Sequence, residues 1–109
     1  MSGTIALTHD ARWSAAGWLF DWTVSFAAEA VTDPAVAAGL HEIVRENLGW
    51  VDVAGLPAAS RTQLLQRLAG ELVTGADAQL PPTLPERAKV LALLGDLAGL
   101  ARQQIGSSA

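Results

Sequence analysis

The side chains able to carry out proton-transfer or metal chemistry are few in this chain of 109 residues. His41, Glu42 and Glu46 form the densest group, and His9 is the only other histidine. Glu42 lies about 100° around a helix from His41, and no second histidine has the spacing of a zinc site. Glu42 and Glu46 are four residues apart, but a carboxylate pair on a wet helix face is weak evidence for acid–base catalysis. We therefore predict an exposed His41, no metal site and no cofactor.

Nucleophiles and phosphate-binding motifs are also missing from the sequence. No serine lies in a nucleophile elbow, cysteine is absent, and the glycines are scattered rather than grouped in a phosphate-binding loop. A chain without cysteine has no disulfide and fits a reducing compartment. We therefore expect a cytoplasmic protein that is not an enzyme.

Aromatic residues are concentrated in one segment, WSAAGWLFDWTVSF at residues 13–26, which holds three of the four tryptophans and both phenylalanines. On a helical wheel this segment has two opposed apolar stripes, and a helix with two apolar faces needs cover on both. The first stripe (Trp13, Phe20, Val24 and Val31) suits the core of the chain. The second, together with the tryptophan at residue 50, is the predicted partner-binding or dimer interface, made of Trp18, Leu19, Trp22, Phe26 and Trp50.

The elements that must position these residues are predicted from start and stop signals. Asp33 followed by Pro34 is a well-formed helix start, and Thr83 with Glu86 has the spacing of a capping box. Alanine is abundant and β-branched residues are sparse, which favours helix over sheet. The signals predict four helices at about residues 10–31, 34–48, 57–74 and 83–104.

The expected fold is therefore an all-α, antiparallel four-helix bundle with short loops, forming a single domain over residues 1–109. Residues 4–7 are compatible with a short extended arm, and residues 106–109 are expected to be a disordered tail. Inside the last helix, Ala88, Ala92, Gly95 and Gly99 form a stripe of small residues that suggests the close approach of another backbone.

Charge and hydropathy narrow the range of partners. The formal net charge is −4, and residues 1–55 carry a charge of −5 while residues 56–109 carry +1. Without a basic patch, nucleic acid is an unexpected partner. The most apolar stretch, residues 13–28, contains Asp21 and is shorter than the roughly 20 residues of a membrane span. The predominance of arginine over lysine suggests a GC-rich bacterial source.

Together these features predict a small acidic interaction protein that binds a protein partner through the aromatic face of the first helix. One form of this function is the neutralisation of a basic toxin or effector, as in immunity proteins and antitoxins. Homodimerisation through the same helix is the second way to cover its exposed stripe. The alternative function is a small-molecule binder with a tryptophan-lined apolar pocket inside the bundle.

Overall fold

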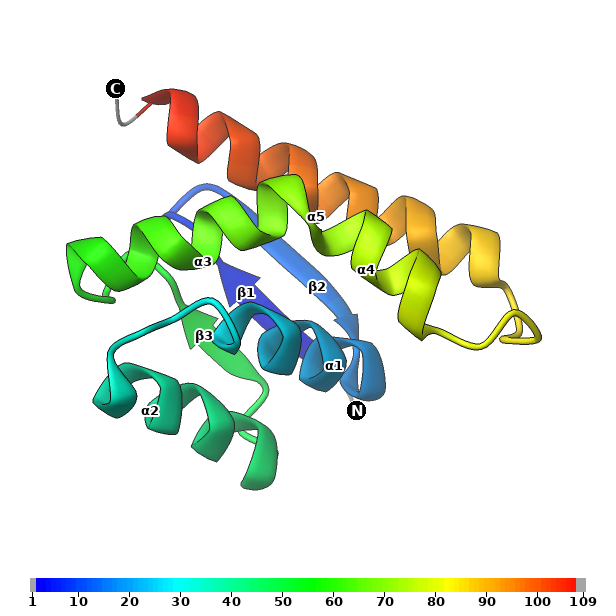
Figure 1. The fold of residues 1–109 in the computed structure, drawn as a ribbon, viewed down its shortest axis with the longest axis horizontal. Helices are drawn as coiled ribbons and strands as arrows, with labels where there is room; N and C mark the ends of the chain where they lie inside the picture. Colours follow the sequence, from blue (N-terminus) through cyan, green and yellow to red (C-terminus); the bar gives the residue numbers. More distant parts are fainter. Residues whose placement is uncertain (1, 108–109) are drawn as a thin grey trace.

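The computed structural model describes residues 2–107, and within them the chain forms five helices and a three-stranded mixed sheet (Figure 1). The predicted all-α four-helix bundle is therefore wrong. In chain order the elements are β1 (Ser2–Ala6), β2 (Arg12–Ala16), α1 (Gly17–Ala28), α2 (Pro34–Arg45), β3 (Trp50–Asp52), α3 (Ala58–Gly70), α4 (Leu72–Gln79) and α5 (Arg87–Ser107).

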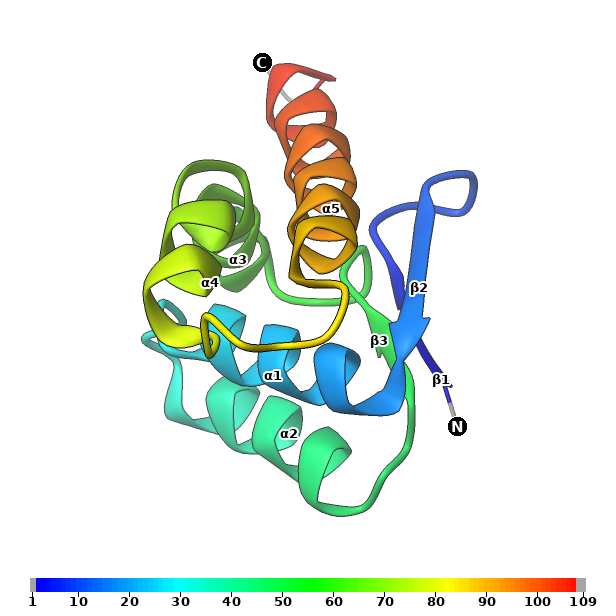
Figure 2. The ribbon, with the colours of Figure 1, turned by 90° about the vertical axis from the view of Figure 1, so that its right-hand side faces the viewer.

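The sheet has the strand order β2-β1-β3, with β1 antiparallel to β2 and parallel to β3. Ile5 of β1 lies opposite Trp13 on one side and Val51 on the other. All three side chains are buried, and the helices cover this inner face of the sheet (Figure 2). The outer face, which carries Ser14 and Trp50, is left open to solvent.

Residues 10–16, predicted as the start of the first helix, form the end of a turn and strand β2 instead. Trp13 and Ala15 are buried while their neighbours Arg12 and Ser14 are exposed, a period of two that belongs to a strand with one covered face. The hydroxyl of Thr8 accepts hydrogen bonds from the backbone N–H groups of residues 10 and 11. Thr8 therefore closes the β1–β2 turn rather than a helix.

Helix α2 begins as the sequence predicts. The carboxylate of Asp33 accepts hydrogen bonds from the backbone N–H groups of Ala35, at 2.9 Å, and Val36, at 3.4 Å, and Pro34 occupies the first turn. The helix ends at Arg45, three residues before the predicted end at Leu48. The chain then turns through positive φ angles at residues 47 and 49 and enters β3.

The third predicted helix is divided at Glu71, where φ is −125°. The segment predicted as a loop from residue 75 is largely α4. Gly75 lies where α4 meets α1, and a Cβ atom there would be only 2.5 Å from the ring of Phe26. Glycine lets α4 approach α1 more closely than any other residue would.

The last helix begins at Arg87, and the predicted capping box is wrong. Glu86, the residue that would close the box, has a φ of 54°, outside the helical region. The helix continues to Ser107, so residues 106 and 107 of the predicted tail are helical, while 108 and 109 lie outside the described residues. A Cβ atom added to Gly95 or Gly99 would meet no neighbour within 4 Å, so neither glycine is needed for the close approach of another helix within the described chain.

The core lies between the sheet and the helices. Its most deeply buried side chains include Phe20 of α1, Leu40 of α2, Leu68 of α3 and two leucines of α5, Leu94 and Leu97. Among the helices within residues 2–107, none has the length and hydropathy needed to cross a membrane.

Candidate functional site

An apolar groove lies where the first turn of α1 meets the start of α5. Trp18 stands at its rim with 48% of its surface exposed. The groove has a volume of about 280 Å³. Its lining comes from the end of β2, the first turn of α1 and the residues around the start of α5: Ala16, Trp18, Leu19, Pro85, Glu86, Lys89, Val90 and Leu93.

Two side chains hold α5 in place beside this groove. The indole Nε1 of Trp13 donates a hydrogen bond of 2.9 Å to the backbone carbonyl of Leu93, which joins β2 to α5. A guanidinium N–H of Arg87 donates to the carbonyl of Asp77 at 2.7 Å and lies 3.0 Å from a carboxylate oxygen of the same residue. Arg87 thereby joins α4 to the start of α5 across the loop between them, and Trp13 joins β2 to the middle of the first half of α5.

The groove is apolar inside and charged at one side. Pro85, Val90 and Leu93 supply hydrocarbon surface, while Lys89 Nζ donates to a carboxylate oxygen of Glu86 at 3.1 Å. Both charged side chains are more than two thirds exposed. This arrangement fits a site that accepts an apolar side chain and has polar contacts at its edge.

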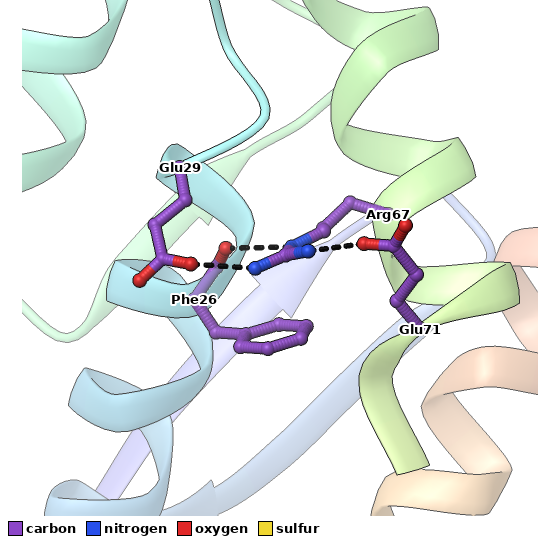
Figure 3. A network of polar contacts seen from close by, with 4 residues as sticks. All are labelled: Phe26, Glu29, Arg67 and Glu71. Atoms are coloured by element: carbon purple, nitrogen blue, oxygen red, sulfur yellow. Dashed lines mark hydrogen bonds and ion pairs between the residues drawn. The ribbon is translucent and has the colours of Figure 1, made fainter. Parts of the chain in front are cut away.

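A second polar cluster centres on Arg67 of α3 (Figure 3). Its guanidinium lies 3.8 Å from the centre of the Phe26 ring, and its Nε donates to the Phe26 carbonyl at 3.2 Å. The remaining nitrogens pair with Glu29, at 2.5 Å, and with Glu71. Sequence reasoning missed this cluster. Arg67 and Glu71 have the i,i+4 spacing of an ion pair on one helix, but Glu29 is 38 positions away from Arg67 and its approach depends on the tertiary structure.

The Arg67 cluster ties α1 to α3 and offers no reactive group. Shallow depressions of about 200 Å³ and 370 Å³ lie on either side of the guanidinium. However, the nitrogens of Arg67 are already engaged with a carbonyl and two carboxylates. We therefore assign the cluster a structural role.

The five predicted interface residues do not share one surface. Leu19 and Phe26 are buried, at 2% and 4% exposure, and Trp22 is half-buried and stacked on Phe26 with ring centres 5.1 Å apart. Trp50 lies on the outer face of the sheet, beneath the guanidinium of Arg12. Only Trp18 combines a half-exposed ring with a groove, because α3 and α4 cover much of the second stripe of the predicted first helix.

The side chain of His41 is exposed, as predicted. Over residues 2–107, no three histidine, aspartate or glutamate side chains are grouped so that they could hold a metal ion. Comparison of the chain with known protein families, curated proteins and solved structures found no match.

Proposed function

We propose that the protein is a non-enzymatic interaction protein that receives an apolar side chain of a protein partner in the Trp18 groove. The observation that carries this proposal is the position of Trp18. A half-exposed tryptophan beside a preformed apolar groove is typical of the centre of a protein interface, where tryptophan contributes much of the binding energy. The ties from Trp13 and Arg87 support the proposal, because a preformed site costs less ordering on binding.

The charge of the chain favours a basic partner. Asp33, Glu42 and Glu46 are exposed on or beside α2, and the net charge of −4 attracts a cationic protein at long range. Neutralisation of a basic toxin or effector, as in immunity proteins, is the form of this function that the charge supports.

A protein partner is favoured over a small molecule. The indole of Trp13 is buried and bonded to Leu93, while Trp50 lies on the sheet. Trp18 is thus the tryptophan that contributes to this groove. The volume of about 280 Å³ lies just below the range of roughly 300–1,000 Å³ that is usual for small-molecule pockets.

The test is site-specific photocrosslinking in the native host. A photoreactive phenylalanine analogue replaces Trp18 in one variant and Val73 in another, because Val73 is an exposed apolar side chain on α4 that does not line the groove. We expect a discrete crosslinked protein from position 18 that position 73 does not capture, and we expect Trp18→Ala to fold normally but lose that partner. Equal capture from both positions, or none from position 18, would contradict the proposal.

A further inference from the structure

Strand β2 forms an open edge of the sheet. It pairs with β1 on one side, and within the described residues no strand lies on its other side. In Figure 2 β2 faces the viewer, and no helix of the drawn chain crosses it. An edge of this kind presents backbone donors and acceptors that another strand can use.

The hydrogen-bond pattern shows which groups of β2 point outward. The N–H of Thr4 donates to Gly49 at 2.9 Å and the carbonyl of Ala6 accepts from Val53 at 2.9 Å, so these two residues of β1 direct their backbone groups toward the β3 side. Ser14 lies opposite Thr4. In an antiparallel pair a residue facing such a partner is not bonded to it through the backbone. The N–H and C=O of Ser14 therefore point away from β1, to the open edge.

The side chains of β2 give this edge little protection against pairing with another strand. Arg12 is the only charged residue of the strand, and charge is a common protection for edge strands. Its guanidinium lies 5.4 Å from the centre of the Trp50 ring, which places it across the sheet toward β3. The other edge strand, β3, is only three residues long and carries Asp52. The open edge of β2 is thus the longer of the two and the less protected.

We propose that a second copy of this chain pairs with β2 through its own β2, antiparallel, about a two-fold axis at Ser14. This register opposes Arg12 to Ala16 and Trp13 to Ala15, so it sets no charge against a like charge and matches a large side chain with a small one. The outward groups of Ser14 on the two copies then exchange both backbone hydrogen bonds, and the two sheets become one. This contact shares only Ala16 with the lining of the Trp18 groove and does not involve the predicted helix stripe.

A second copy is the favoured occupant because β2 is complementary to itself in this register. The strand is complementary to itself because its one charge and its one large side chain each lie opposite an alanine. An isologous contact of this kind also closes at two subunits and leaves no further free β2 edge.

Cysteine crosslinking tests the register directly, since the chain has no native cysteine. Across the two-fold axis the Ser14 Cα atoms would lie about 5.5 Å apart, within disulfide range. The Ala16 Cα atoms would lie about 14 Å apart, given the rise per residue of a strand. We expect Ser14→Cys to form a covalent dimer on mild oxidation and Ala16→Cys, an exposed position of the same strand, to remain monomeric. Equal crosslinking of both variants, or none at position 14, would overturn the proposal.

A proline substitution tests the contribution of the backbone. Ser14→Pro removes an N–H that makes no bond to β1, and proline is tolerated at such edge positions. Ser14→Ala is the matched control, because both variants lose the 2.8 Å hydrogen bond between the Thr4 and Ser14 hydroxyls.

By sedimentation equilibrium from low micromolar to millimolar concentration, we expect wild type and Ser14→Ala to dimerise. Ser14→Pro should raise the dimer dissociation constant about tenfold or more. A monomeric wild-type protein over that whole range, or equal dimerisation of the two variants, would refute strand pairing. Circular dichroism identifies a proline variant that fails to fold, and in that case the cysteine pair decides the question.

Discussion

Replacement of Arg67 by alanine should be among the most destabilising single changes outside the leucine core. Its side chain is only 21% exposed, whereas its partners Glu29 and Glu71 are 59% and 57% exposed. Arg67 also donates to the carbonyl of Phe26, in the last turn of α1. That carbonyl lacks the usual helical donor, because the N–H of Ala30 bonds to residue 27 instead.

The expected loss follows from these contacts. A hydrogen bond from a charged donor contributes about 1.5–3 kcal/mol, and a partly desolvated cation over an aromatic ring contributes about 1–2 kcal/mol. The two ion pairs add little, since pairs with exposed carboxylates are typically worth about 0.2–1 kcal/mol each. Contributions that share one side chain are not strictly additive. We therefore expect Arg67→Ala to lower the free energy of unfolding by about 3–4 kcal/mol.

Urea unfolding followed by tryptophan fluorescence measures this loss. Arg67→Met keeps the apolar stem over Phe26 but has no donor, so its stability should fall between wild type and the alanine variant. Arg45→Ala is the control, because Arg45 is 68% exposed and pairs only with Glu46 at 3.7 Å; its effect should stay within about 0.5 kcal/mol. A loss below about 1 kcal/mol for Arg67→Ala would show that the cluster in Figure 3 acts only as exposed ion pairs.

Two further comparisons check the local structure by thermal or urea unfolding. Asp33→Ala should cost about 1 kcal/mol because it removes a helix cap. Thr83→Ala should stay within about 0.5 kcal/mol, because Thr83 lies four residues before the start of α5 and the positive φ of Glu86 separates the two. An equal loss in both variants would support the predicted capping box. Gly75→Ala should destabilise the fold by about 1–3 kcal/mol, because the added Cβ would meet the ring of Phe26. Gly95→Ala should stabilise the fold by about 0.5–1 kcal/mol, because its Cβ would enter open space on a helix. A stabilising effect at position 75 would show that α4 does not need its close approach to α1.

Local signals in the sequence determined the helices that depend on them. Asp33 and Pro34 start α2 because a carboxylate cap and a fixed φ angle act within a few residues. Leu64, Leu65 and Leu68 have the spacing of one helix face, and all three are buried on α3. The exposure of His41 follows from the same periodicity.

The helix predicted over the aromatic segment was wrong in its first part, because the start of that helix depends on non-local pairing. A helical wheel applied to residues 13–26 treats Trp13 and Trp18 as members of one helix, but the chain changes from strand to helix between Ala16 and Gly17. The Trp18 groove is formed by residues some 70 positions apart, on α1 and α5. Its lining therefore emerges only once the tertiary arrangement is known.

Tertiary structure alone decided that the chain contains a sheet. Strand β2 is only five residues long and includes two alanines, and β3 is only three residues long. Neither segment shows a clear strand pattern in the sequence alone. Each becomes a strand because β1 satisfies its backbone, while α1 packs against β1 and β2 and α2 packs against β3. Helix caps act through neighbouring residues and can be read from the sequence, whereas strand pairing joins segments up to 46 positions apart in register. The free energy of strand pairing comes from partner strands that the local sequence does not specify.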